Sequence, residues 1–113
     1  MKNKISSLSK SEDFKTLLGG RKISNPYSTI FFKKIYSKNT KLLNVSFIAK
    51  RKIGNAVKRN RIKRRLRNIM NDAIKTTNMN LNYSYLFIAK KNMYDAEYKM
   101  IKDSILKDLA KVK

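Results

Sequence analysis

The residues best suited to do chemistry in this sequence are cations, and many of them fall in one short run. The 18 residues from Lys50 to Arg67 read KRKIGNAVKRNRIKRRLR and hold ten lysines and arginines with no acidic residue. Lysine and arginine bind phosphate oxygens, and arginine can do so through two parallel hydrogen bonds. The run therefore indicates binding to a polyanion, for which nucleic acid is the commonest example.

The composition leaves little for catalysis by the protein itself. The chain has no cysteine and no histidine, which excludes disulfides, thiol nucleophiles, zinc sites built on those residues and imidazole catalysis. Seven carboxylates face 28 lysines and arginines, a formal net charge of +21. The three glycines form neither a P-loop nor a dinucleotide fingerprint. We expect no catalytic residue, no metal ligand and no cofactor or small-molecule substrate bound by the protein.

An amphipathic helix must position most of the cations. From about Asn55 to Lys75, apolar residues recur at the spacing of one helix face: Ile62, Leu66, Ile69 or Met70, and Ala73 or Ile74. The polar residues fall on two flanks of the opposite face, Asn60, Arg64 and Arg67 on one and Arg61, Arg65 and Asn68 on the other. Arg59 falls near the apolar side. Gly54-Asn55 is a plausible N-cap, beside backbone N–H groups that can bind phosphate.

The remaining elements predict a single α+β domain over residues 1–113. Ser9-Lys10-Ser11-Glu12 fits a capping box, which opens a short helix that stops at Gly19-Gly20. Strands are predicted over residues 27–36, 43–49 and 83–89, with a further short strand over 21–24 and a polar turn over 37–41. A closing helix is predicted from Tyr94 to about Lys111, with Asp95 and Glu97 in its first turn. The expected fold is an α+β sandwich, a sheet of three or four strands with helices packed on it.

No segment suggests a membrane protein. The first ten residues carry no apolar run typical of a signal peptide, and the longest apolar run, from Leu86 to Ala89, is far too short to cross a bilayer. We therefore expect a cytoplasmic protein without a membrane partner.

The run from Lys52 to Arg67 also resembles the signature of a known family, the bacterial ribonuclease P protein component. That pattern is a basic residue followed by G-x-A-V-x-R-N-x-x-K-R-x-x-R, and its fixed positions are filled here by Gly54, Ala56, Val57, Arg59, Asn60, Lys63, Arg64 and Arg67. Ser11-Glu-Asp-Phe14 resembles the family's first helix. Gly20-Arg-Lys-Ile-Ser24 resembles the start of its sheet, and Tyr85-Leu-Phe-Ile-Ala-Lys90 the strand after the basic helix.

The resemblance implies a ribonucleoprotein function. The family's protein is the small subunit of an enzyme whose catalyst is RNA, with Mg²⁺ required by that RNA, and which removes the 5′ leader of precursor tRNA. The implied partners are therefore the catalytic ribonuclease P RNA and precursor tRNA including its leader. The implied fold is an α/β sandwich with a mixed sheet and a left-handed strand–helix–strand crossover, an exception to the usual chirality.

The resemblance also implies which residues bind RNA. Phe14 and Phe31 match aromatic residues of a cleft between the first helix and the sheet, which holds the single-stranded leader. Where the family usually has a second aromatic one turn after Phe14, this chain has Leu18. Because Phe31 and Phe32 are neighbours on a strand, one ring should face the core and the other the cleft.

The conserved polar set of the family is matched by Lys52, Arg59, Asn60, Lys63, Arg64 and Arg67. Arg51 and Arg61 join this set by charge and position.

Two other functions fit part of the sequence. A ribosomal protein or assembly factor would explain the charge and fold, but not the ordered Arg-Asn-Arg run with its flanking elements. A nuclease acting on its own would need catalytic side chains that this sequence lacks. The RNA that copurifies with the protein separates these readings, because each names a different RNA.

Overall fold

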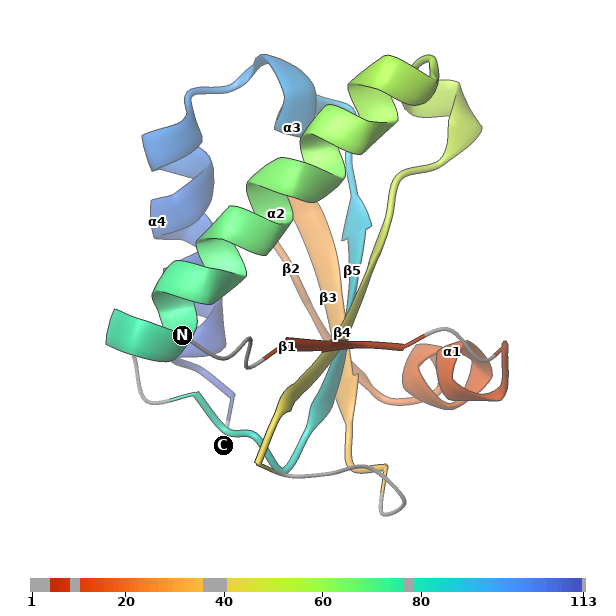
Figure 1. Ribbon diagram of the computed structural model, residues 1–113, viewed down its shortest axis with the longest axis vertical. Coiled ribbons are helices and arrows are strands. Elements are labelled where there is room, and N and C mark those ends of the chain that lie inside the picture. Colours follow the sequence, from red (N-terminus) through yellow and green to blue (C-terminus); the bar gives the residue numbers. More distant parts are fainter. Residues whose placement is uncertain (1–4, 9–10, 36–40, 77–78, 113) are drawn as a thin grey trace.

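The computed structural model describes residues 5–8, 11–35, 41–76 and 79–112, and its centre is a five-stranded mixed sheet. The strands are β1 (Ile5–Ser7), β2 (Arg21–Ser24), β3 (Ser28–Lys33), β4 (Leu43–Ile48) and β5 (Ser84–Ala89). They lie in the order β1-β4-β5-β3-β2 (Figure 1). The pairs β1–β4 and β4–β5 are parallel, and the pairs β3–β5 and β2–β3 are antiparallel.

Helices cover both faces of this sheet. The helices are α1 (Ser11–Leu18), α2 (Ala56–Thr76), α3 (Asn92–Asp95) and α4 (Tyr98–Leu109), and a short 3₁₀ turn, η1 (Arg51–Ile53), leads into α2. In Figure 1 the helices α2 and α4 lie on one side of the sheet and α1 on the other. The long helix α2 connects two neighbouring parallel strands, β4 and β5, so the basic run forms the crossover of a strand–helix–strand unit.

Strand alternation creates two separate apolar clusters. On β3, Ile30 and Phe32 point into the main core beneath α2 and α4, where Ile62, Leu66 and Ile105 are fully buried. The intervening residue Phe31 points to the other face, and packs with the cluster of Leu8, Leu17 and Leu86 beneath α1. The predicted opposite orientation of Phe31 and Phe32 is confirmed.

The predicted α+β sandwich is confirmed, with one strand more than expected. The predicted short strand at 21–24 is present as β2, at the edge of the sheet. The additional strand β1 has only three residues, Ile-Ser-Ser, and two of them have no strong preference for a strand. Its extended conformation is stabilised by parallel pairing with β4. The predicted turn at 37–41 lies mostly outside the described residues, as do Ser9 and Lys10 of the predicted capping box.

The prediction of one closing helix from Tyr94 to about Lys111 was wrong. The chain forms α3 and α4 with a break at Ala96 and Glu97, both of which have extended backbone angles. Asp95 therefore ends one helix, and Glu97 is the N-cap residue of the next without a side-chain capping hydrogen bond. The break is stabilised from outside, because the guanidinium of Arg65 on α2 donates to the carbonyls of Met93, Tyr94 and Ala96.

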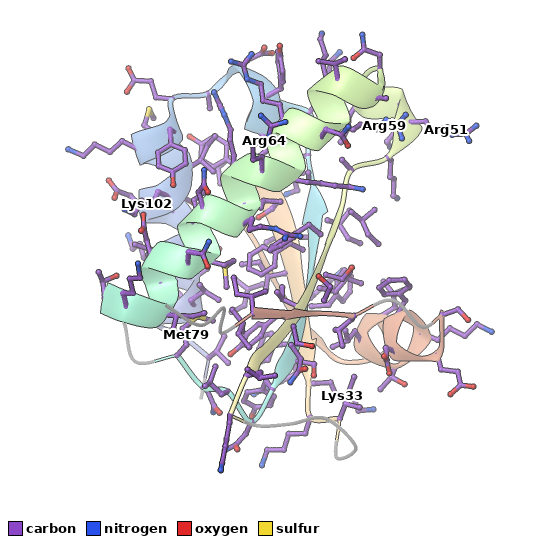
Figure 2. All side chains as sticks on the ribbon, in the orientation of Figure 1. Lys33, Arg51, Arg59, Arg64, Met79 and Lys102 are labelled. Carbon is purple, nitrogen blue, oxygen red and sulfur yellow. The ribbon has the colours of Figure 1, made fainter. Side chains whose placement is uncertain are left out.

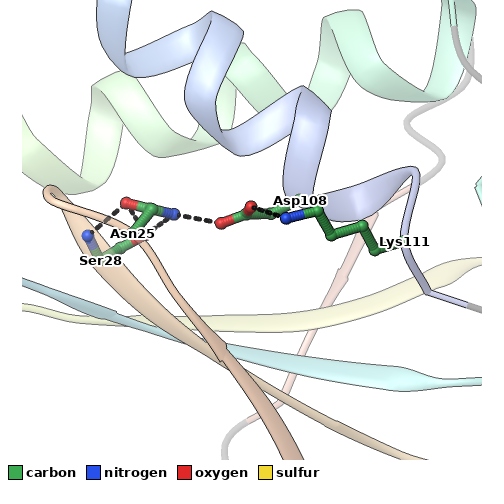
Figure 3. Close-up of polar contacts among 4 residues, drawn as sticks. All are labelled: Asn25, Ser28, Asp108 and Lys111. Atoms are coloured by element: carbon green, nitrogen blue, oxygen red, sulfur yellow. Dashed lines mark hydrogen bonds and ion pairs between the residues drawn. The ribbon is translucent and has the colours of Figure 1, made fainter.

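A buried polar cluster ties the turn between β2 and β3 to α4 (Figure 3). The Nδ2 of Asn25 donates to Oδ2 of Asp108 at 2.9 Å, and its Oδ1 accepts the backbone N–H of Ser28 at 2.8 Å. Lys111 lies 3.7 Å from the same carboxylate. The buried polar side chains of Asn25, Ser28 and Asp108 therefore have hydrogen-bond partners, and these contacts link the turn to α4.

Candidate nucleic-acid interface

The exposed face of α2 is a surface of cations. The residues that point into the core are Ile62, Leu66, Ile69, Met70 and Ala73, as the sequence predicted. Opposite them, the solvent-exposed side chains include Asn60, Arg61, Lys63, Arg64 and Arg67. Figure 2 shows Arg59 near the start of the helix and Arg64 farther along it. We call this set of exposed residues the basic face.

The start of α2 is fixed by an N-cap. The Oδ1 of Asn55 accepts the backbone N–H of Lys58 at 2.9 Å, as expected for an N-cap residue, and its carbonyl accepts the N–H of Arg59 at 3.0 Å. Arg51 and Lys52 lie exposed in η1, immediately before this cap. The predicted site residues at 51–52 and on α2 therefore form one continuous cationic segment around a helix N-terminus, which also favours anions.

Arg59 differs from the residues of the basic face. Its side chain is half-buried, as its position near the apolar side predicted. Its Nε atom is buried, and among the described residues it has no hydrogen-bond partner. A buried donor without an acceptor costs about 1–3 kcal/mol.

Two cations of the run are engaged within the protein. Arg65 was expected on an exposed flank of the helix, and this was wrong: it is half-buried and its Nη1 bonds three backbone carbonyls at 3.1–3.4 Å. The Nζ of Lys58 lies 5.0 Å from the centre of the Tyr94 ring, a cation–π contact. Both residues lie on the side of α2 that faces α3.

The sheet face beneath α1 carries partly exposed apolar side chains. Phe31 of β3 is paired with Leu86 of β5, and Phe14 of α1 packs against the same cluster. Phe14 and Phe31 are both half-buried, so each keeps part of its ring accessible. The next pair along the sheet, Ile48 and Ile88, continues this surface. We call it the aromatic face.

Leu18 does not take the place of a second aromatic residue within the cluster. Its side chain is 51% exposed, whereas the neighbouring Leu17 is fully buried. Leu18 therefore offers an exposed apolar surface at the end of α1, without a ring for stacking.

A pocket of about 550 Å³ joins the aromatic face to the start of the basic run. Its lining combines three apolar residues, Ile53, Ile88 and Ala89, with four lysines, Lys50, Lys52, Lys90 and Lys91. Ile88 belongs both to this pocket and to the aromatic face. The ammonium of Lys90 donates to the carbonyl of Asn25 at 2.7 Å, which holds its side chain across the end of the sheet. We call this site the lysine pocket.

The whole chain, residues 1–113, matches the family model described as Ribonuclease P. The chain belongs to the ribonuclease P protein family. It is 34% identical over 113 residues to the ribonuclease P protein component of Fusobacterium nucleatum, covering 96% of this chain and 94% of the relative. It is 37% identical over 98 residues to that of Petrotoga mobilis, covering 83% of this chain and 78% of the relative.

Solved structures of this family have the same fold. The ribonuclease P protein from Thermotoga maritima superposes with a TM-score of 0.80 at 20% identity, covering 96% of this chain and 98% of that one. The mixed sheet with helices packed on it is therefore the fold of the ribonuclease P protein family.

Part of the lysine pocket is not predicted from the sequence. The charge pattern and the family resemblance indicate Lys52 as a site residue but not Lys50, Lys90 or Lys91, although Lys90 ends the stretch that resembles the family's strand. A signal was available, because parallel neighbouring strands such as β4 and β5 end on the same side of a sheet. Lysines that directly follow two such strands are expected to lie together.

Within the described part of the chain, no three acidic side chains gather in an arrangement that could hold a metal ion. No helix there is both long and apolar enough to cross a membrane.

Proposed function

We propose that this chain is the protein subunit of a bacterial ribonuclease P, which binds the catalytic RNA through the basic face and the 5′ leader of precursor tRNA along the aromatic face. The observation that carries the proposal is the lysine pocket, because it shares Ile88 with the aromatic face and Lys52 with the cationic segment that leads into the basic face. A strand of RNA lying on the aromatic face would meet lysines where that face ends.

The basic face suits a structured RNA. Its arginines lie on a rigid helix, so the spacing of their backbone positions is fixed before binding. Less conformational entropy is therefore lost when they contact RNA. Arg64 lies opposite the buried stripe and, with Arg67, can bind phosphate oxygens in pairs. Arg59 would contribute the accessible part of its half-buried side chain at the edge of this surface. The proposed contact with the catalytic RNA also includes the other exposed polar residues of this segment: Arg51, Lys52, Asn60, Arg61 and Lys63.

The aromatic face suits an unpaired strand. The accessible parts of Phe14 and Phe31 offer surfaces on which bases can stack without regard to their identity. The ammonium groups around the lysine pocket would bind the phosphates of the same strand. Such a site accepts leaders of varied sequence, which a processing enzyme acting on many precursors requires.

In this proposal the protein contributes binding and charge, and the RNA contributes the chemistry. The RNA subunit and the Mg²⁺ ions that it holds supply the hydrolysis of the phosphodiester bond at the start of the mature tRNA. The protein holds leader and RNA together in the cytoplasm and neutralises phosphates. Cations on the protein thereby replace part of the Mg²⁺ otherwise needed to counter phosphate repulsion.

Reconstitution tests this proposal. Purified, RNA-free protein is mixed with precursor tRNA, with and without a bacterial ribonuclease P RNA, over a range of Mg²⁺ concentrations. We expect no cleavage by the protein alone, and cleavage by the mixture at a lower Mg²⁺ concentration than the RNA needs by itself. Cleavage by RNA-free protein would contradict the division of roles. Recovery of ribosomal RNA instead of ribonuclease P RNA on purification from cells would favour the assembly-factor alternative.

A further inference from the structure

A second pocket lies at the other end of the sheet from the lysine pocket. It has a volume of about 490 Å³ and is lined by Gly19, Gly20, Arg21, Phe32, Lys33, Lys34 and Tyr83. Along the β3–β5 ladder, Ser28 pairs with Ala89 at one end and Lys33 with Ser84 at the other. Five residue steps of strand, roughly 17 Å, separate the two ends. Figure 2 shows Lys33 far from Arg51 and Arg59.

Arg21 is held in this pocket by two aromatic rings. Its guanidinium carbon lies 4.8 Å from the centre of the Phe32 ring and 5.5 Å from that of Tyr83. Its Nη2 also donates to the Tyr83 hydroxyl at 2.9 Å. The two rings are in edge-to-face contact, with centres 5.4 Å apart. The guanidinium therefore has a fixed position although its side chain is exposed.

The rest of the lining adds positive charge and space. Lys33 and Lys34 are exposed, and the Nζ of Lys34 lies 6.0 Å from the Tyr83 ring. Among the described residues that line the pocket none is acidic. Gly20 lets α1 approach β3 closely, because a Cβ atom at that position would lie 2.7 Å from the carbonyl oxygen of Phe32.

These features define the chemistry of a ligand. The two exposed lysines favour a phosphate, and the rings with the stacked guanidinium favour a flat base beside it. The volume is within the range of sites that hold molecules of nucleotide size, and a concave site of this size admits one unpaired nucleotide but no double helix. The net charge of +21 brings RNA, as a polyanion, to this protein more readily than it brings a monovalent anion.

We propose that this second pocket binds an unpaired RNA nucleotide, with its phosphate at Lys33 and Lys34 and its base against Arg21 and Tyr83. The site goes beyond the proposed function, since it lies at the far end of the sheet from the lysine pocket, and its Phe32 ring belongs to the main core rather than to the cluster that contains Phe31. It gives the protein an RNA contact separate from the leader surface and the basic face.

The test follows the full-length protein by NMR during titration with uridine 5′-monophosphate, a five-residue oligouridylate and inorganic phosphate. We expect the resonances of Arg21, Lys33, Lys34 and Tyr83 to shift with the nucleotide, and the oligonucleotide to bind more tightly than the mononucleotide. Arg21→Gln and the double variant Lys33→Ala/Lys34→Ala should each weaken oligonucleotide binding at these resonances about fivefold or more, as expected for loss of a stacking or phosphate contact. Lys107→Ala, which removes an exposed cation of α4, should change it less than twofold.

Photo-crosslinking provides a second measurement that does not depend on the variants folding. An oligouridylate carrying one 4-thiouridine should crosslink to Tyr83 in the unmodified protein. Unshifted resonances together with no crosslink at Tyr83 would overturn the proposal. Equal shifts with inorganic phosphate would show a simple anion site, and tighter binding of the mononucleotide would show a free-nucleotide site; either result would also overturn it. No ribonuclease P RNA is present, so these failures are distinct from failure of the proposed function.

Discussion

Arg64 and Arg65 are adjacent in α2, yet Arg64 is exposed on the basic face whereas Arg65 donates hydrogen bonds to the carbonyls of Met93, Tyr94 and Ala96. The helical turn of 100° between successive residues is enough to separate a side chain available for binding from one that stabilises the fold. A charge run therefore contains residues with opposite consequences on mutation.

We expect Arg65→Ala to lower the free energy of unfolding by about 2 kcal/mol, since hydrogen bonds to a charged group contribute about 1.5–3 kcal/mol. Arg64→Ala, which removes the same side chain one position earlier, serves as the matched control and should leave stability within about 0.5 kcal/mol of the unmodified protein. Urea denaturation of both variants measures the difference. Equal stability of the two variants would show that the contacts of Arg65 contribute nothing to the fold.

Phe31 and Phe32 form a second matched pair. Phe32 is 4% exposed within the main core, so Phe32→Ala should cost about 3–5 kcal/mol of stability. Phe31 is half-buried on the aromatic face, so Phe31→Ala should cost less stability and weaken leader binding by about 1–3 kcal/mol. Thermal melts and the affinity for precursor tRNA with and without its leader are the measurements. A larger loss of melting temperature in Phe31→Ala than in Phe32→Ala would reverse the assignment.

The sequence predicts best where periodicity and chain length agree. The 3.6-residue spacing of Ile62, Leu66 and Ile69 predicts both the extent of α2 and its buried side, because a long pattern with this period fits an amphipathic helix and not a strand. It does not predict the role of Arg65, which depends on carbonyls about 30 residues later in the chain. The break at Ala96 cannot be predicted from the local sequence for the same reason, since the guanidinium that stabilises it belongs to Arg65 of another helix.

The binding surfaces are less accessible to sequence reasoning than the basic helix. Lys50 and Lys90 are 40 positions apart, and only the parallel pairing of β4 and β5 brings them to one pocket. Arg21 and Tyr83 meet through the pairing of β2, β3 and β5, and no local pattern marks either residue. Sheet order and register, which arise from tertiary packing, decide these sites.

The ion pair between α2 and α4 predicts a pH dependence of stability. Lys102 Nζ lies 2.8 Å from Oδ2 of Asp72, and the hydrogen bond and charge of Lys102 lower the pKa of Asp72 below its ordinary value. A lowered folded-state pKa stabilises the protein above the unfolded pKa of about 3.9, and this contribution disappears as the pH falls through the folded value. The stability difference between the unmodified protein and Asp72→Asn should therefore be small at pH 7, because the pair is partly exposed, and should shrink as the pH falls below the unfolded pKa of about 3.9 and Asp72 becomes protonated. Urea midpoints of both proteins at several pH values test this; a difference that grows as the pH falls would contradict it.

Arg64 and Arg67 should determine the salt dependence of RNA binding. Both are exposed opposite the buried stripe of α2, so their loss removes phosphate contacts without opening the core. Each lost contact should reduce the slope of log affinity against log salt by about 0.7 to 0.9. Stability should change little or rise, since neighbouring cations repel one another in the free protein.

The measurement is the affinity for ribonuclease P RNA at several salt concentrations for Arg64→Ala, Arg67→Ala and the double variant, with thermal melts alongside. Lys107→Ala on α4 is the control for loss of one positive charge and should leave the slope unchanged. Unchanged slopes in all three arginine variants would place the binding surface elsewhere, and a large loss of melting temperature would make these arginines structural.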